Sequence, residues 1–95
     1  MPFCYILYSP TLKRFYTGAC LNLQERIKAH NTAKYGHSKY TSKAKDWNLF
    51  LDIQVDTYNH ALRIERKIKA MKSAVFKQNL KKYPEMVQRL INETQ

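Results

Sequence analysis

Residues 14–30 read RFYTGACLNLQERIKAH. Its first five residues, RFYTG, form a short aromatic run that is typical of a β-strand. Glycine adopts backbone conformations that other residues avoid, so Gly18 predicts a sharp turn at the end of this strand. Asn22, followed three residues later by Glu25, resembles a capping box and predicts a helix from about Leu23 to Tyr35. The stretch therefore predicts a strand that leads directly into a helix.

A second strand precedes this stretch. Residues 3–8, FCYILY, are a continuous aromatic and aliphatic run, and Ser9-Pro10-Thr11 after them has the chemistry of a turn. Two such runs with a turn between them predict a β-hairpin with a loop of several residues.

A third strand follows a basic loop. Residues 36–46, GHSKYTSKAKD, combine glycine, serine and lysine without an apolar period, which predicts an exposed loop. Every second residue is then apolar over residues 47–55, namely Trp47, Leu49, Leu51, Ile53 and Val55. This alternation predicts a strand with one buried face.

The rest of the chain predicts helices. Thr57 or Asn59 can cap a second helix, whose apolar residues recur every three or four positions and are expected to face the core: Ala61, Ile64, Ile68, Met71 and Val75. Pro84 suits the first turn of a last helix over about residues 84–93, with Met86, Val87, Leu90 and Ile91 on its apolar side. This last helix is expected either to complete the core or to form a dimer contact.

The order of these elements is ββαβα plus C-terminal helices. It predicts the α+β class, with a small three-stranded antiparallel or mixed sheet flanked by helices. A chain of 95 residues has room for one domain, with a core over about residues 3–82.

The charge of the chain points to a polyanionic partner. It has 17 Lys and Arg against 7 Asp and Glu, a net charge of +10. No acid lies between Arg26 and Lys45, and Glu65 is the single carboxylate from Thr57 to Pro84. Such a field attracts nucleic acid, whose binding releases counterions. A merely solvated basic surface and anionic lipid are the alternatives, but no segment has the amphipathic pattern of a membrane-surface helix.

The N-terminus and the cysteines suggest an intracellular protein. MPFCYILYSP has neither a basic start nor a small-residue cleavage site, so it does not resemble a signal peptide, and no apolar run reaches membrane-spanning length. Cys4 and Cys20 are expected to be reduced thiols, and two cysteines so far apart cannot alone form a zinc site. We therefore expect a cytoplasmic, nucleoid-associated protein without a membrane segment.

Five side chains could carry chemistry. Arg26 and His30 lie one turn apart on the predicted helix, where they could bind a phosphate and exchange a proton, or simply be exposed cations. Tyr5 and Tyr16 could direct phenols into a cleft or only pack. Glu65 could pair with Lys69 or hold Mg²⁺, which often takes one or two carboxylates together with substrate phosphate.

These residues together resemble the GIY-YIG nuclease family, in its short stand-alone form, from Phe3 to about Lys82. Phe3-Cys4-Tyr5 matches the first signature of the family and Tyr16-Thr17-Gly18 the second, with the two tyrosines 11 residues apart. The stretches LQERIKAHN, ALRIERKIKAMK and KDWNLF also match. The chain departs from the family pattern at Phe3, Cys4 and Thr17, which replace glycine, isoleucine and isoleucine, but it keeps the hydroxyls, the guanidinium and the carboxylate.

The resemblance implies a DNA endonuclease that hydrolyses phosphodiester bonds with Mg²⁺ or Mn²⁺. Glu65 would hold the ion, Arg26 would bind the nonbridging oxygens, and Tyr16 with Tyr5 would orient or deprotonate the attacking water. His30 would accept that proton or hold the tyrosine.

The DNA partner is expected to lie on basic residues around the site: Lys28, Lys34, Lys39, Tyr40, Lys43, Lys45, Lys69 and Lys72. Without an appended recognition module, we expect cleavage that is structure-selective or weakly sequence-selective, as in DNA repair or recombination, with a protein partner or a homodimer as further options. A non-catalytic nucleic-acid-binding module of the same fold is the main alternative, and a subunit whose basic face meets an acidic protein is another.

Overall fold

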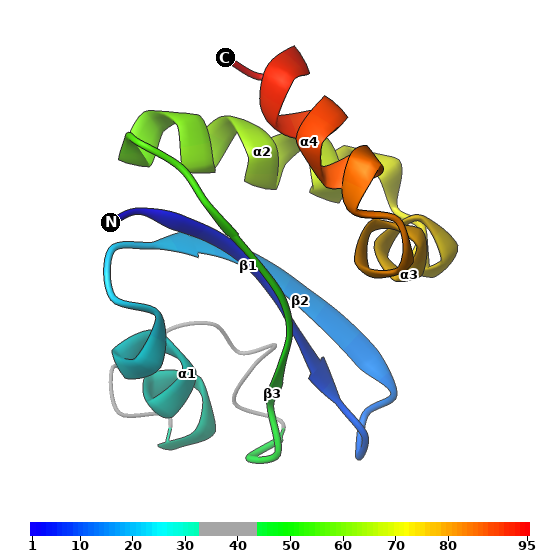
Figure 1. Ribbon diagram of the computed structural model, residues 1–95. Coiled ribbons are helices and arrows are strands. Elements are labelled where there is room, and N and C mark those ends of the chain that lie inside the picture. Colours follow the sequence, from blue (N-terminus) through cyan, green and yellow to red (C-terminus); the bar gives the residue numbers. More distant parts are fainter. Residues whose placement is uncertain (33–43) are drawn as a thin grey trace.

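A three-stranded antiparallel sheet and its flanking helices form the part of the chain that the computed structural model describes, residues 1–32 and 44–95 (Figure 1). The elements in chain order are β1 (Phe3–Ser9), β2 (Arg14–Cys20), α1 (Leu23–Thr32), β3 (Asn48–Gln54), α2 (Tyr58–Met71), α3 (Ala74–Lys82) and α4 (Pro84–Glu93). The predicted α+β class is confirmed, and of the two predicted kinds of sheet the antiparallel one is present.

The strand order is β2-β1-β3, so the first strand of the hairpin is the central strand. β1 pairs with β2 from Phe3 opposite Cys20 to Ser9 opposite Arg14. Its pairing with β3 shifts register between Ile6 and Leu7, where a β-bulge interrupts the ladder. β2 is therefore an edge strand of the described sheet, with no described strand paired to its outer side.

The predicted turn at Gly18 is wrong. β2 continues to Cys20, and Gly18 lies inside the strand, directly opposite Tyr5 on β1. The sequence-based reasoning used the conformational freedom of glycine, whereas the reason for glycine here is close packing against a neighbouring strand.

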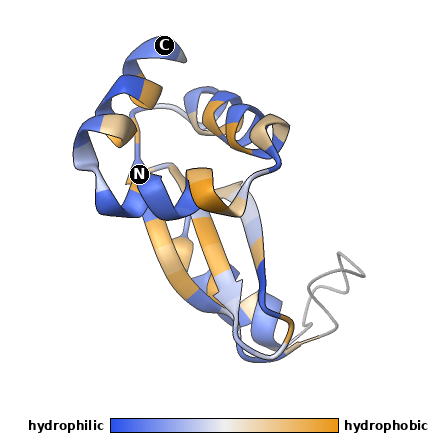
Figure 2. Ribbon diagram, turned by 90° about the vertical axis from the view of Figure 1, so that its right-hand side faces the viewer, coloured by the Kyte–Doolittle hydropathy of each residue, from blue (hydrophilic) through white to orange (hydrophobic). Residues whose placement is uncertain are grey.

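The helices cover the two faces of the sheet unequally. α1 lies on one face, and α2, α3 and α4 lie together on the other (Figure 1). Hydrophobic residues are concentrated along the strands between these layers (Figure 2). The larger core, between the sheet and α2–α4, contains Ile6, Ile64 and Ile68. The smaller core, on the α1 side, contains Tyr5, Leu7 and Trp47.

The long apolar stripe predicted for the second helix is interrupted. α2 begins after Thr57, whose side chain accepts a hydrogen bond from the backbone N–H of His60 at 3.1 Å. It ends where Lys72 takes a left-handed conformation with φ 48°. Met71 and Val75 are 48% and 64% exposed, so the prediction that they face the core is wrong.

The last helix completes the core, one of its two predicted roles. Leu90 is 4% exposed and packs in the larger core. Two residues of α2 also bind the end of α4: His60 Nε2 lies 2.9 Å from Thr94 Oγ1, and Arg63 Nε donates to the Thr94 carbonyl at 2.6 Å. α4 is thereby held on α2 at both its apolar face and its C-terminal end.

The first helix begins at Leu23, as predicted, with Asn22 Oδ1 accepting from the Glu25 N–H at 3.1 Å. Residues 33–35 of the predicted helix and residues 36–43 of the predicted basic loop lie outside the described residues. Where the chain is described, it contains no helix of the length and apolarity needed to cross a membrane.

Candidate active site

The site is built around Tyr5 on the central strand. Its ring lies against Gly18 so closely that a Cβ atom at residue 18 would be 2.5 Å from the phenol oxygen and 2.7 Å from Cζ. Real Cβ atoms do not come so close to other heavy atoms, so a side chain at residue 18 would displace the phenol. Gly18 therefore determines where the hydroxyl of Tyr5 lies.

The Tyr5 hydroxyl contacts His30 inside the protein. The distance between the Tyr5 oxygen and His30 Nε2 is 2.9 Å, and both residues are only 2% exposed. Burial, reinforced by the neighbouring Tyr16, raises the pKa of Tyr5 well above its ordinary value, against a smaller lowering effect of Arg26. Tyr5 thus remains a neutral phenol at physiological pH, and its O–H can donate to Nε2 when that nitrogen carries no proton.

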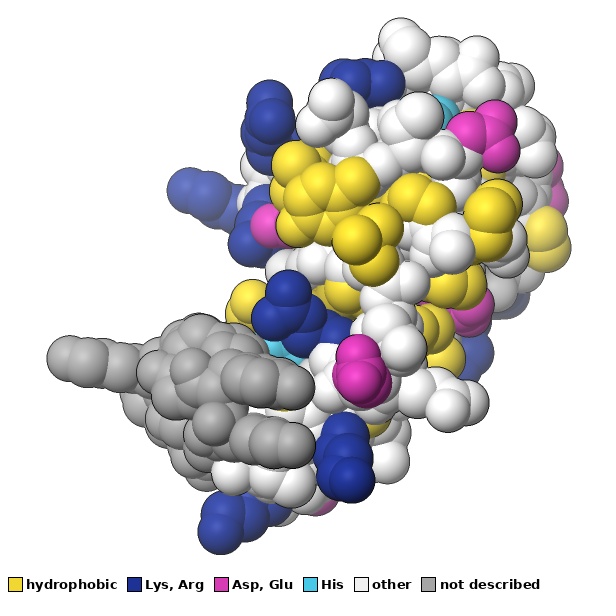
Figure 3. All heavy atoms as spheres, turned by 90° about the vertical axis from the view of Figure 1, so that its left-hand side faces the viewer, with side chains coloured by type: hydrophobic (Ala, Val, Ile, Leu, Met, Phe, Trp, Pro, Cys, Tyr) yellow, Lys and Arg dark blue, Asp and Glu magenta, His cyan; other side chains and the backbone are white. Residues whose placement is uncertain are grey.

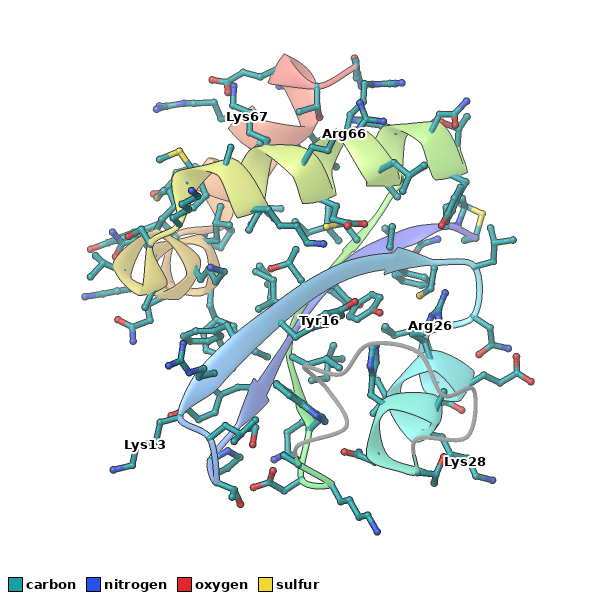
Figure 4. The ribbon with its side chains drawn as sticks, turned by 180° about the vertical axis from the view of Figure 1, so that it is seen from behind. Lys13, Tyr16, Arg26, Lys28, Arg66 and Lys67 are labelled. Carbon is teal, nitrogen blue, oxygen red and sulfur yellow. The ribbon has the colours of Figure 1, made fainter. Side chains whose placement is uncertain are left out.

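Tyr16 lies beside this pair and is less buried than Tyr5. Its ring centroid is 4.8 Å from that of His30, 6.5 Å from that of Tyr5 and 6.3 Å from that of Trp47. In Figure 4, Tyr16 lies near the middle of β2, between α2 on one side and α1 with Arg26 on the other. Among the aromatic residues of the site, Tyr16 is thus the one placed to meet a ligand at the sheet edge.

Helix α1 supplies Arg26 and His30 from successive turns. The N–H of Arg26 donates to the Asn22 carbonyl at 3.2 Å, so the capped first turn fixes its backbone. The positive charge of Arg26 acts to lower the pKa of both Tyr5 and Cys20, although burial raises both values overall. Arg26 is therefore electrostatically coupled to the buried tyrosine, while its half-buried side chain remains open to solvent.

Asn31 is a supporting residue that the sequence-based reasoning missed. Its side-chain amide donates to the Trp47 carbonyl at 2.9 Å and accepts from the Trp47 N–H at 2.7 Å. This reciprocal pair holds the chain that enters β3 against the end of α1 and so fixes the indole beside Tyr16. In the sequence, Asn31 directly follows the candidate residue His30, which could have drawn attention to it. Only the fold, however, brings Trp47 next to Asn31.

Glu65 and Lys69 form the charged part of the site on α2. Lys69 Nζ lies 2.8 Å from Glu65 Oε2 and 5.7 Å from the centroid of the Tyr16 ring. Burial opposes the charge of Lys69, but the hydrogen bond to Glu65 and the nearby Tyr16 raise the pKa of Lys69 above its usual value. The Glu65 side chain is 19% exposed, which leaves one side of the carboxylate accessible.

This carboxylate fits a divalent ion only as part of a shared site. Within residues 1–32 and 44–95, no group of three or more His, Cys, Asp and Glu side chains could hold a metal ion. Mg²⁺ is commonly held by one or two carboxylates with water and substrate phosphate as the other ligands. A single, partly exposed Glu65 suits such an ion when substrate supplies oxygen ligands.

The fold connects the five candidate catalytic residues in different ways. Tyr5, His30 and Tyr16 form a contiguous aromatic cluster, and Lys69 joins that cluster to Glu65. Arg26 is linked to this cluster through its charge, which acts to lower the pKa of Tyr5. The catalytic roles themselves stay predictions.

The predicted DNA-binding residues are spread more widely. Lys28, Lys45 and Lys72 are exposed, and Lys69 is within the site. Lys34, Lys39, Tyr40 and Lys43 lie outside the described residues. Figure 3 shows basic side chains projecting from the margins of one side of the molecule, with apolar side chains gathered between them. A protein partner or homodimer stays a prediction.

Comparison with known proteins gives a consistent result. Residues 1–79 match the family model described as the GIY-YIG catalytic domain. A UPF0213 protein from Syntrophus aciditrophicus (strain SB) is 37% identical over 73 residues, which cover 77% of this chain and 83% of that protein. No solved structure matches.

Proposed function

The chain belongs to the GIY-YIG family, whose domain is that of a nuclease superfamily, and we propose that it is a divalent-metal-dependent DNA endonuclease. The observation that carries this proposal is the cluster in which Tyr5, His30, Tyr16, Lys69 and Glu65 meet. These residues come from two strands and two helices, so their assembly depends on the whole fold. They combine phenols, an imidazole, a cation and a carboxylate beside one open strand edge.

The two tyrosines have different roles in this proposal. Tyr5 is 2% exposed and hydrogen-bonded to His30, so it acts as a positioning residue that holds the imidazole. Tyr16 is more accessible and orients or deprotonates the attacking water. The Lys69 ammonium, 5.7 Å from the centroid of the Tyr16 ring, places a positive charge beside this residue. The tilted ring of His30 packs beside Tyr16, 4.8 Å between centroids, and helps to fix its orientation.

The cations and the carboxylate act on the phosphate. The planar guanidinium of Arg26 matches two nonbridging oxygens and offsets the charge that develops on them in the transition state. Glu65 is the residue that would hold Mg²⁺ or Mn²⁺. An ion bound there supplies polarisation of the phosphate and stabilisation of the leaving 3′ oxygen.

The substrate that we propose is DNA recognised by its structure rather than by a strict sequence. The net charge of +10 supports binding through phosphates, which carry no sequence information. Branched, nicked or flapped DNA fits such recognition, and a role in DNA repair or recombination would follow for a cytoplasmic, nucleoid-associated protein.

The test is incubation of the purified protein at low salt with labelled branched and linear DNA in Mg²⁺, Mn²⁺ or EDTA. Glu65→Gln and Tyr16→Phe should each lose metal-dependent cutting by at least about 100-fold, the scale of losing one transition-state contact. Glu93→Gln is the matched control, because Glu93 also pairs with a lysine of α2, Lys67, at 3.5 Å. Cutting that persists in both site variants would overturn the assignment.

A non-catalytic nucleic-acid-binding module is the second candidate, and the ion pair between Glu65 and Lys69 favours it. The 2.8 Å contact engages Oε2 of the carboxylate that a divalent ion would need. Salt-sensitive binding without cutting, equal in the wild type and in both site variants, would support this candidate.

A further inference from the structure

A second cationic surface lies on α3, away from the candidate active site. No acid is present from Arg66 to Pro84 in the sequence. Two lysines of α3 lie over aromatic rings of the sheet: Lys77 Nζ is 5.9 Å from the centroid of Phe15, and Lys81 Nζ is 4.6 Å from that of Phe50. The two rings pack edge to face with centroids 4.9 Å apart. We call these four residues the α3 patch.

The rings hold the two ammonium groups without neutralising them. A lysine over an aromatic face is attracted by the negative face of the ring, which favours one position of the amine. In the described part of the chain, ion pairs are made by Lys67 with Glu93 and by Lys69 with Glu65, and neither lysine of the patch has a carboxylate within 4 Å. Burial lowers the pKa of Lys77, so its charge is partly desolvated without an opposite charge beside it.

The patch and the candidate active site share one strand. Phe15 and Tyr16 are consecutive on β2, so their side chains lie on opposite faces of the sheet. Phe15 packs against the larger core and Tyr16 against the smaller core. In Figure 4, β2 crosses the view with Tyr16 near its middle, α3 on the side of the Lys13 end and Arg26 near the other end. A polyanion that reaches Tyr16 across this open edge can continue onto α3.

We propose that the α3 patch is a second phosphate-binding site, which holds the backbone of a duplex DNA arm that extends from the bond at Tyr16. This inference rests on the proposed function, because it assumes that DNA is the substrate. It also gives a physical basis for selectivity by DNA structure: Arg26 and Lys69 contact one part of the substrate while Lys77 and Lys81 contact an arm.

The chemistry of the patch selects phosphate rather than bases. Each ring has an ammonium group over it, so a base would have to displace a lysine in order to stack. Lysine amines are compact charges suited to single phosphate oxygens. The side chain of Lys81 is exposed at the helix surface, where a backbone can reach it without opening the core.

The test compares DNA binding in EDTA, where the readout is independent of cutting. The variant Lys77→Gln/Lys81→Gln loses two phosphate contacts, so the slope of log affinity against log salt should become shallower by about 1.8. The loss should appear with a duplex or branched DNA and be absent with an oligonucleotide too short to span both sites. The matched control is Lys67→Gln/Arg89→Gln, which removes the same charge from the groove between α2 and α4.

The outcomes separate the patch from the nuclease proposal. Equal slopes for the patch variant and the control variant would overturn the inference, even if the protein cuts DNA. A shallower slope in a protein that never cuts would keep the patch and remove the proposed activity. Lys77→Arg/Lys81→Arg should restore the slope, which excludes loss of folding as the cause. Binding of polyglutamate that depends on the patch, with duplex binding unaffected, would instead indicate an acidic protein ligand and overturn the proposal.

Discussion

The two faces of the sheet hold their polar groups in contrasting ways. On the α1 side, Tyr5 and His30 are each 2% exposed and are joined by a 2.9 Å contact within packed aromatic rings. On the α2 side, Glu65 and Lys69 form an ion pair whose side chains are 19% and 51% exposed. The first pair is fixed by packing, whereas the second is held mainly by charge, and an added ion or phosphate can exchange with it. The orienting groups are thus rigid and the charged groups adjustable.

The largest expected effect is at Gly18, which leaves room for the Tyr5 ring on the rigid α1 side of the sheet. Gly18→Ala places a Cβ atom 2.5 Å from the Tyr5 oxygen, so the phenol or the strand must shift. Overpacking of this kind typically costs about 1–3 kcal/mol of folding free energy, and denaturant unfolding measures it. The displaced phenol should also lose its contact with His30.

A double-variant cycle checks the cause. Tyr5→Leu removes the ring atoms that the new Cβ would meet, so Gly18→Ala should cost much less in that background. Additive costs would contradict the close-packing explanation and would indicate that glycine is needed for backbone reasons.

The next effect concerns the hydrogen bond inside the rigid cluster. Tyr5→Phe keeps the ring but leaves His30 Nε2 without the phenol, which should destabilise the fold by about 1.5 kcal/mol. Cutting should slow through kcat rather than KM, since the contact positions His30 beside Tyr16. Tyr8→Phe is the matched control, because Tyr8 is on the same strand and packs its ring on Phe15 at 4.9 Å. If Tyr5→Phe leaves the free energy of unfolding unchanged, the contact between Tyr5 and His30 is as adjustable as the ion pair on the α2 side.

Local patterns in the sequence predicted most of the elements. Alternating apolar residues gave the third strand, and the capping signals gave the starts of α1 and α2, because these features depend on residues near in sequence. The resemblance of the signatures also indicated the family. The break after Met71 was missed because Lys72 adopts a left-handed conformation, which favours glycine or asparagine and is not suggested by lysine.

The parts of the site that the sequence did not predict are long-range contacts. Gly18 faces Tyr5 through strand register, and Asn31 binds Trp47 across 16 residues of chain. Neither pair leaves a periodic pattern. The cations over Phe15 and Phe50 likewise come from a helix that follows those strands by many residues. Contacts between segments that are distant in the sequence are therefore the main information that the structure provides beyond the sequence motif.

A smaller effect is expected on the adjustable side. Lys69→Met removes the cation that occupies Glu65, so the free protein should bind Mn²⁺ about two- to fivefold more tightly, the value of an exposed ion pair of about 0.4–1 kcal/mol. Electron paramagnetic resonance of free Mn²⁺ measures this without DNA. The control is Lys67→Met, whose partner Glu93 is elsewhere on the surface. Affinity that is unchanged or weaker would show that Lys69 does not compete with the ion.

The smallest expected effect is at Thr17 of β2, whose position in the strand puts its side chain on the same face as Phe15 and Ala19 of the larger core. Thr17 is 4% exposed, and its hydroxyl has no hydrogen-bond partner among the described residues. A buried hydroxyl without a partner costs free energy, so the nearly isosteric Thr17→Val should stabilise the fold by up to about 1 kcal/mol in denaturant unfolding. Ser9→Ala is the contrasting control: Ser9 is buried as well, but it donates to Asp46 at 2.6 Å, and its loss should destabilise the fold. If Thr17→Val is destabilising instead, the hydroxyl binds a water molecule or another partner in solution. Thr17 would then be grouped with the adjustable polar groups, such as Glu65 and Lys69, rather than with the side chains that are fixed by packing.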